Sequence, residues 1–509
     1  MKSNQLKLGV LLSYASMALN MVVQLVYTPV MIRLLGQSEY GLYTLVGSVV
    51  SYLSLFSLGF TGAYLRFYSR YAQKGDRTGV ARLNGMFLTL FLCMSAAAIV
   101  CGMTLSQFTP QLFGTNLTPA ELSKAKVLMQ ILVINVALTF PSSVFDSIVS
   151  AHEQFLFQRV LQLAGVVFNP LICLPLLLMG HGSVAVVGVT TAITIAKLAT
   201  NIWFCRFKIH APFEFRHFNF SLLKEIGAFS FFLFLNMIID QVNWSVDKFI
   251  LGRVAGTIQV AIYGVATQFN SMYQTFATAI SSVFAPRVNR MVAEQTPDSD
   301  KEVSDLLVRV GRLQYIISLY IFIGFLFAGR QFVMWWAGNE YEASYLVAIW
   351  LLSPMVIILP HSLGIEIRRA KNRHQLASVI MFGTAVFNVA ISIPLAHIWG
   401  AAGAAFGTWL GLLVNTVIID VYYVKLIHLD IKRLYLNIIQ LSKSVAIPIG
   451  FGLIGICFDS LEICLAWAIP YSALYGFFVY RFGMNNSERE LAKKPLAKLM
   501  VDCIMKLDT

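Results

Sequence analysis

The sequence predicts an all-α polytopic membrane protein of about fourteen transmembrane helices, arranged as two parallel six-helix bundles plus two C-terminal helices. Three observations lead to this prediction. The 509 residues are 57% hydrophobic and only 12% charged, whereas soluble proteins carry about 25% charged residues. Apolar stretches long enough to cross about 30 Å of hydrocarbon recur along the whole chain. In two cases, an apolar stretch in the first half of the chain resembles one in the second half, and the distance along the chain is nearly the same in both cases.

The paired stretches indicate an internal duplication. Val-Phe-Asn at 167–169 recurs at 386–388, 219 positions later, and Asn-Met at 20–21 recurs at 236–237, 216 positions later. Both shifts run in the same chain direction, so each half should hold an even number of spans with the same orientation. The alternative is chance similarity between apolar helices, which share a small alphabet. Paired Asn and Pro positions argue against it.

Hydropathy places the individual spans in order along the chain. The first bundle should comprise spans at about 8–32, 41–62, 83–105, 125–149, 161–179 and 184–205, the second bundle spans at about 226–250, 259–284, 309–334, 345–365, 376–398 and 401–424, and the additional pair spans at about 442–458 and 463–481. The predicted domains are therefore a bundle at 1–205, a cytoplasmic linker at 206–225, a bundle at 226–424, two further helices at 442–481 and a basic cytoplasmic tail at 482–509.

Charge placement predicts the orientation. With both termini in the cytoplasm, about 31 of the 38 Lys and Arg fall on the inner side. Such positive runs also explain the net charge of +13, and contacts with anionic lipid headgroups account for them better than nucleic-acid binding does. The seven Cys are scattered without a CxxC pair or a His cluster at metal spacing, so neither a disulfide framework nor a metal site is expected.

The segment after the first span carries a family resemblance. Its sequence is Arg33-Leu34-Leu35-Gly36-Gln37-Ser38-Glu39-Tyr40-Gly41-Leu42-Tyr43. It resembles the opening of bacterial polysaccharide flippases of the O-antigen type, within the multidrug/oligosaccharidyl-lipid/polysaccharide exporter superfamily. The resemblance extends over the fourteen spans and includes Tyr263-Gly264.

The resemblance implies a function, a location and partners. Such proteins turn undecaprenyl-pyrophosphate-linked oligosaccharides from the inner to the outer leaflet of the bacterial inner membrane, for O-antigen, capsule or related polymers. It implies alternating access without a cofactor, with H⁺ or Na⁺ as a possible coupling ion. It also implies contacts with membrane lipids and with polysaccharide polymerase and assembly proteins, and no nucleic-acid partner.

The seventh span carries a polar stripe, consisting of Asn236, Asp240, Asn243 and Asp247. Spacings of four, three and four residues place them on one face of a helix, and charged groups within spans rarely face lipid. We therefore expect the stripe to line a cavity, with Asp240 as the leading ion-coupling residue and Asp247 as the second. The alternative is structural ion pairing, of Asp247 with the neighbouring Lys248 or of Asp240 with Lys197.

Four cations at span level are candidate ligands for pyrophosphate: Arg66, Lys197, Lys248 and Arg33. Arg can grip phosphate oxygens through two N–H groups, and Lys acts as a point charge. Lys197 lies midway along an apolar stretch, whereas Arg66 can equally be a positive-inside anchor. Asn20, Gln24 and Gln274 complete the expected polar lining, with interhelical hydrogen bonding as the alternative for Gln274. No role is predicted for Asp146, Asp420 or His361.

The sequence bears differently on three other functions. A membrane polymerase or glycosyltransferase would place catalytic groups in sizeable loops, and this chain has short loops and no nucleotide-binding or nucleophile motif. We therefore expect no enzymatic activity. An ion-coupled multidrug exporter would have about twelve spans and an acidic, aromatic cavity, so the extra pair of spans and the cationic candidates disfavour it. A flippase for the peptidoglycan precursor remains an open alternative.

Overall fold

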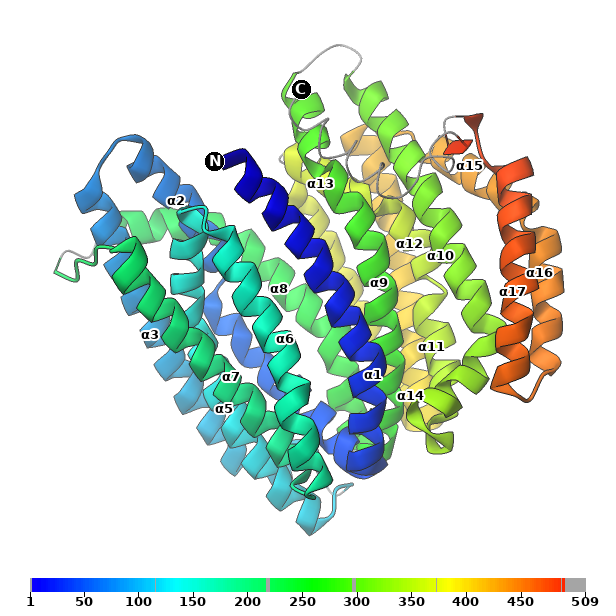
Figure 1. Ribbon diagram of the computed structural model, residues 1–509, viewed down its shortest axis with the longest axis horizontal. Helices are drawn as coiled ribbons and strands as arrows, with labels where there is room; N and C mark the ends of the chain where they lie inside the picture. The colour runs from blue at the N-terminus through cyan, green and yellow to red at the C-terminus, as the bar shows by residue number, and fades with distance from the viewer. Residues whose placement is uncertain are drawn as a thin grey trace. The chain divides into compact units, whose positions relative to one another are not determined.

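The computed structural model describes residues 2–114, 116–216, 220–294, 299–371, 373–486 and 488–489. The regular structure of these residues is helical throughout, with no strand (Figure 1). Among them, nine helical segments are long and apolar enough to cross a membrane, or ten if one bent pair forms a single span. An all-helical, multi-pass membrane protein is therefore confirmed. The count of fourteen spans and the two-bundle layout remain predictions.

The chain divides into two compact units. Unit 1 comprises Met1–Gly264 and Ala385–Ala404, and unit 2 comprises Val265–Thr384 and Ala405–Thr509. The predicted boundaries at 205 and 226 follow the sequence repeat rather than these contacts, and they remain predictions. Of the predicted tail, residues 490–509 lie outside the described part of the chain.

Unit 1 contains the helices of the first half of the chain and the first helix of the second half. In chain order they are α1 (Lys2–Ser51), η1 (Tyr52–Ser57), α2 (Thr61–Gln73), α3 (Arg77–Gln107), α4 (Thr109–Phe113), α5 (Pro119–Ala151), α6 (Phe155–Leu178), α7 (Gly182–Phe204), η2 (Cys205–Ile209) and α8 (Phe220–Val254). The start of α9 (Gly256–Ala293) and the middle of α14 (His374–Tyr422) also belong to it.

Unit 2 contains most of the later helices. Besides the remainders of α9 and α14, these are α10 (Ser299–Ala337), η3 (Asn339–Tyr341), α11 (Ser344–Leu352), α12 (Met355–Ile358), η4 (Leu359–His361), α13 (Ser362–Ala370), η5 (Tyr423–Ile427), α15 (Ile431–Ser444), α16 (Ala446–Leu453), η6 (Ile454–Cys457), α17 (Leu461–Phe478) and η7 (Val479–Gly483).

Two long helices break at glycines between predicted spans. In α1 the break is at Gly36, with φ +74°, and in α14 it is at Gly400, with φ +57°. Glycine tolerates this left-handed region because it has no Cβ. Each long helix is therefore two helical segments joined at a kink. The breaks coincide with the gaps expected between 32 and 41 and between 398 and 401.

The two halves of the chain also end alike. Helix α7 passes into the π-turn η2 and stops at His210, and α14 passes into the π-turn η5 and stops at His428. Both histidines have a left-handed backbone conformation, with φ +54° and +60°. They lie 218 positions apart, which is close to the repeat shifts. This shared ending favours the duplication predicted from the sequence.

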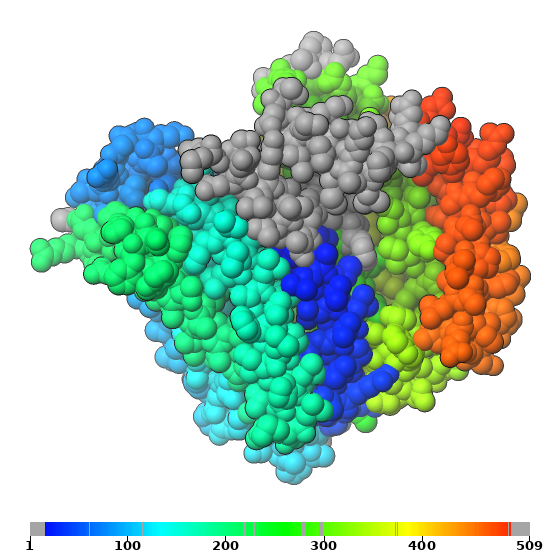
Figure 2. All heavy atoms as spheres, in the orientation of Figure 1, coloured from blue at the N-terminus to red at the C-terminus, as the bar shows by residue number. Residues whose placement is uncertain are grey.

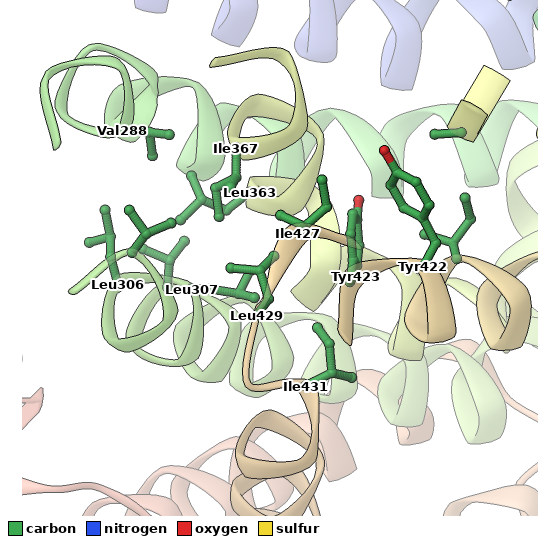
Figure 3. Packing of buried hydrophobic residues seen from close by; sticks show 14 residues of the cluster. Val288, Leu306, Leu307, Leu363, Ile367, Tyr422, Tyr423, Ile427, Leu429 and Ile431 are labelled. Carbon is green, nitrogen blue, oxygen red and sulfur yellow. The ribbon is translucent and has the colours of Figure 1, made fainter. Parts of the chain in front are cut away.

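Each unit has its own core. In unit 1, α5 packs against α3 and α7, while α6 packs against α1. In unit 2, aliphatic side chains of α10, α13 and the η5 turn meet, as Figure 3 shows for Leu306, Leu363 and Ile427. Burying such side chains yields about 25 cal/mol per Å² of area removed from water.

Arg312 of α10 holds the segment that follows η7 against the other helices of unit 2. Its guanidinium contacts Glu488 at 2.7 Å, and it also donates to the side-chain oxygen of Asn437 and the carbonyl oxygen of Gly483. The two charged side chains are only 3% and 2% exposed. Burial on this scale is tolerated because the pair is charge-balanced and the guanidinium has further acceptors.

Candidate functional site: a cationic cavity in the first unit

A cavity of about 1050 Å³ lies within unit 1, among α1, α5, α6 and α7. Small-molecule sites usually span about 300–1,000 Å³, so it can hold a sizeable headgroup. Figure 2 shows the surface of α6 beside α1, two helices that pack against each other. All lining residues belong to unit 1.

The central charged group of the cavity is an ion pair between Lys197 of α7 and Asp146 of α5. The ammonium lies 2.8 Å from Oδ2 of Asp146. Asn201, one turn along α7, donates to Oδ1 of the same carboxylate at 2.8 Å. Residues four apart lie on one helix face, so Lys197 and Asn201 reach Asp146 together. The side chains of Lys197 and Asp146 are 42% and 30% exposed, and a ligand in the cavity can therefore reach both.

The start of α6 contributes a second cation. Gln158 donates from Nε2 to the backbone oxygen of Asp146 and to Ser150 Oγ, both at 2.7 Å, and so fixes α6 against α5. The next residue, Arg159, lines the cavity and donates to Oε1 of Gln162 at 2.9 Å. With Lys197, Arg159 and Asp146 among its lining residues, the described cavity carries one net positive charge.

The structure brings some predicted residues together and separates others. Lys197 and Asn20 line the same cavity, and Asn20 also donates to the backbone oxygen of Ser16 at 3.2 Å. Arg33 of α1 and Arg66 of α2 are exposed and lie outside this lining. Three half-buried predicted residues also lie outside it: Gln24 of α1, Lys248 of α8 and Gln274 of α9, the last of which is in unit 2.

The polar stripe on α8 varies in burial along its length. Asp247 is buried and accepts a hydrogen bond from the hydroxyl of Tyr263 at 2.5 Å, while Asp240 is exposed. Asn236 and Asn243 are half-buried, and none of the four lines the cavity. The ion-coupling roles of Asp240 and Asp247 remain predictions.

Asp146 and Arg159 are the two charged lining residues that sequence reasoning missed. Asp146 was assigned no role because it lies near a predicted cytoplasmic helix end, where carboxylates are normally solvated. Arg159 was one of many cations on the predicted inner side. Spacing within one helix carries no signal for Asp146, since its partner Lys197 lies on another helix. The contact of Arg159 with Gln162 on its own helix does not distinguish Arg159 from an ordinary surface pair. Only the crossing of α5 and α7 brings Lys197 to Asp146.

A second polar cluster joins α1, α5 and α9 within unit 1. Glu121 caps the start of α5, and its carboxylate accepts hydrogen bonds from Ser38 at 2.6 Å and Thr257 at 2.9 Å. Close by, Gly41 packs so tightly that a Cβ there would lie 1.9 Å from the backbone oxygen of Thr257. This cluster, Ser38, Glu121 and Thr257, fastens three helix ends together.

Known proteins share this fold over most of its length. A solved structure titled "Lipid II flippase MurJ, inward closed conformation" superposes with a TM-score of 0.74 at 15% identity, covering 96% of this chain and all of that one. A Shigella flexneri protein named "Putative O-antigen transporter" is 21% identical over 400 residues, 77% of this chain and 92% of its own. A Haloferax volcanii protein named "Probable low-salt glycan biosynthesis flippase Agl15" is 20% identical over 264 residues, 52% of each chain.

The family itself follows from a match over more than half of the chain. The family model described as "Polysaccharide biosynthesis protein" matches residues 6–292, which include every helix that lines the cavity. The Shigella and Haloferax relatives are named as a transporter and a flippase. The chain therefore belongs to the polysaccharide biosynthesis protein family.

Proposed function

We propose that this protein moves undecaprenyl-pyrophosphate-linked oligosaccharides from the inner to the outer leaflet of the bacterial inner membrane. The glycan would then enter a surface polymer such as O antigen or capsule. Both termini would lie in the cytoplasm, and the polymerase and assembly proteins of the pathway would be its partners. Family membership and the cavity of unit 1 support this proposal.

The observation that carries the proposal is the net positive charge of the cavity. A pyrophosphate and its sugars must cross about 30 Å of hydrocarbon, where each exposed polar group costs several kcal/mol. A polar cavity with cations removes much of that cost, because charge-assisted hydrogen bonds to phosphate are stronger than neutral ones. Lys197 and Arg159 supply such donors.

Lys197 is held ready for an anionic ligand. Asp146 keeps its ammonium extended toward the cavity, and Asn201 holds the carboxylate by a separate hydrogen bond. An arriving pyrophosphate could replace Asp146 as the main counter-ion of Lys197, while Asn201 continues to hold Asp146. A cation-exporting site would need the opposite balance of charge, with carboxylates in excess.

The proposed cycle is alternating access: the headgroup enters from the cytoplasmic side and leaves on the outer side. A proton or sodium gradient would bias the exchange through Asp240, with Asp247 as the second candidate. Arg66, Lys248 and Arg33 lie outside the cavity lining. We propose that they meet the pyrophosphate along its path, before or after Lys197 holds it.

Reconstitution tests the proposal directly. Purified protein in proteoliposomes would be given a fluorescent undecaprenyl-pyrophosphate oligosaccharide, and its movement between leaflets followed with and without a proton or sodium gradient. We expect protein-dependent movement without a change in glycan length. Lengthening of the glycan would indicate a polymerase. Movement of organic cations, with none of the lipid-linked glycan, would indicate a drug exporter.

A further inference from the structure

Unit 2 contains a buried cluster of three titratable side chains that the cavity of unit 1 does not use. His361 ends η4, Asp420 lies near the end of α14, and Tyr435 lies on α15. The Nε2 atom of His361 is 3.3 Å from Oδ1 of Asp420, and the hydroxyl of Tyr435 donates to Oδ2 at 2.5 Å. The side chains of His361 and Asp420 are only 8% and 14% exposed.

The contacts of His361 fix where its protons lie. Its Nδ1 is 2.7 Å from the backbone oxygen of Ile357. A carbonyl oxygen only accepts hydrogen bonds, so Nδ1 carries a proton. In a neutral imidazole the other nitrogen, Nε2, then has a bare lone pair. That lone pair would face Oδ1 of Asp420, which is also an acceptor when the carboxyl group is ionised.

The two facing atoms, Nε2 of His361 and Oδ1 of Asp420, have no other hydrogen-bond partner among the described residues. Both atoms are buried. Two unsatisfied buried acceptors in contact are unfavourable. A single additional proton between them removes the conflict, because it converts the contact into an imidazolium–carboxylate pair or a neutral hydrogen-bonded pair.

Among the described groups packed around this pair, none donates a hydrogen bond to Nε2 of His361 or to Oδ1 of Asp420. Tyr435 of α15 already donates to the other carboxylate oxygen, and Gln314 of α10 donates to Ser362. Arg312, also on α10, is engaged by Glu488. On α13, buried Arg368 directs its two terminal nitrogens at Met381 Sδ, at 3.6 Å, and Tyr423 packs beside Gly364.

The corresponding place in unit 1 is built differently. Asn201 lies 219 positions before Asp420, which is the shift of the later repeat. There the ammonium of Lys197 neutralises the charge of Asp146, and the amide of Asn201 donates a hydrogen bond to it. The same shift takes Lys197 to Thr416, which donates to the carbonyl oxygen of Leu412. At the repeat position the second half therefore has Thr416 in place of the lysine, and His361 lies beside the carboxylate instead.

We propose that His361 and Asp420 form a proton-binding site that takes up and releases one proton during the transport cycle. In the unloaded form, His361 is neutral and Asp420 is ionised, so the pair carries one negative charge. Uptake of H⁺ forms an N–H bond at Nε2, which gives an imidazolium–carboxylate pair of net charge zero. Histidine suits this role because its charge changes in the physiological pH range.

The position of the pair indicates the side from which protons arrive. His361 is followed closely along the chain by Arg368, Arg369 and Lys371, a basic run that the positive-inside rule places at the cytoplasmic surface. Proton exchange is therefore expected with the cytoplasm. Sodium would fit this site poorly, because hard cations such as Ca²⁺ and Mg²⁺ select oxygen ligands and one of the two orphaned atoms is a nitrogen.

Nitrogen NMR of the histidine rings tests the site without transport or substrate. Full-length protein labelled with ¹⁵N-histidine would be placed in lipid nanodiscs and recorded between about pH 6 and about pH 8, with the His361→Gln spectrum used for assignment. We expect a proton on the Nε2 side of His361 in the loaded form, and the spectrum reports its loss when the pair releases it. In Asp420→Asn, Nε2 should instead stay unprotonated, because the Asn amide can donate to it.

His152 provides a matched internal control. Its Nδ1 also lies near a backbone oxygen four residues earlier, that of Ile148, at 2.9 Å, but its Nε2 faces the hydroxyl of Tyr68 at 3.3 Å. A hydroxyl can donate, so the neutral ring is satisfied there. The His152 signals should not respond to Asp420→Asn. If His361 were unprotonated at Nε2 throughout the range, or unaffected by Asp420→Asn, the proposal would fall.

A transport measurement then tests whether the proton drives movement, and this part depends on the proposed flippase function. One coupled proton shifts the distribution of substrate between leaflets by up to about tenfold per unit of pH gradient. His361→Gln and Asp420→Asn should lower that ratio to about one, while His152→Gln should keep it. If the NMR result is as expected but no substrate moves, the proposed flippase function is wrong and the proton-binding site stands. If both variants keep gradient-driven movement unchanged, the site does not couple the proton to transport. Tyr435→Phe, a milder change, serves if Asp420→Asn does not fold.

Discussion

Replacing Lys197 by Met tests whether Lys197 only forms a structural ion pair or also binds the phosphate of the substrate. Lys197→Met removes the ammonium but keeps most of the apolar stem. Exposed ion pairs contribute about 0–1 kcal/mol and breaking buried ones costs about 3–5 kcal/mol. The Lys197–Asp146 pair is about one-third exposed and Asn201 keeps its bond to Asp146. We therefore expect a loss of only about 1–2 kcal/mol in stability.

The effect on the anionic headgroup should be larger. A hydrogen bond to a charged group contributes about 1.5–3 kcal/mol, which corresponds to an affinity about 10- to 150-fold weaker. Binding of the lipid-linked pyrophosphate would be measured by titration calorimetry and its movement in proteoliposomes. Lys208→Gln is the control, because Lys208 is an exposed cation of the same unit outside the cavity lining.

Asp146→Asn gives the decisive comparison. This change frees Lys197 from its counter-ion, so binding of pyrophosphate should be preserved or tightened. If the pair were only structural, Lys197→Met and Asp146→Asn would weaken transport equally, and the double variant would restore it. That pattern, together with unchanged headgroup affinity in Lys197→Met, would refute the assignment of Lys197 to the substrate.

Three further perturbations test other parts of the molecule. Glu488→Ala should lower the free energy of unfolding by about 3–5 kcal/mol, because it leaves the buried guanidinium of Arg312 without its carboxylate. Thermal unfolding measures this loss. The control is Glu342→Ala, which removes an exposed ion pair and should cost under about 1 kcal/mol. Gly41→Ala should force α1 away from Thr257, since the new Cβ would lie 1.9 Å from the backbone oxygen of Thr257. A disulfide between cysteines placed at positions 38 and 257 should therefore form several-fold more slowly in this variant. An unchanged rate would contradict this. Asp240→Asn should weaken gradient-dependent movement while preserving headgroup binding, and an unchanged response to the gradient would exclude Asp240 as a coupling residue.

Much of the fold was predictable because it depends on local signals. Hydropathy marks apolar helices, and the breaks at Gly36 and Gly400 fall between predicted spans. The charged centre of the cavity was only partly predictable. Lys197 was identified from its place in an apolar stretch, but Asp146, its partner, lies 51 positions away on another helix. Such pairs depend on how helices cross, which spacing within a single helix does not determine.

The same limit applies to His361 and Asp420. Each residue lies near a predicted cytoplasmic helix end, where a solvated polar side chain is unremarkable. Their significance comes from the packing of η4, α14 and α15, which leaves two acceptors facing each other. The repeat contained one usable clue, since Asp420 stands where Asn201 stands in the first half.

Every residue that lines the cavity belongs to a single unit, and this constrains how transport can be driven. A cavity built wholly within one unit can keep its shape, and hence its affinity for the headgroup, while access to it changes. A ligand that binds two states equally well does not shift their populations. On its own, such a cavity would equalise the two leaflets. Net movement in one direction would then require an ion gradient or removal of the glycan after it arrives.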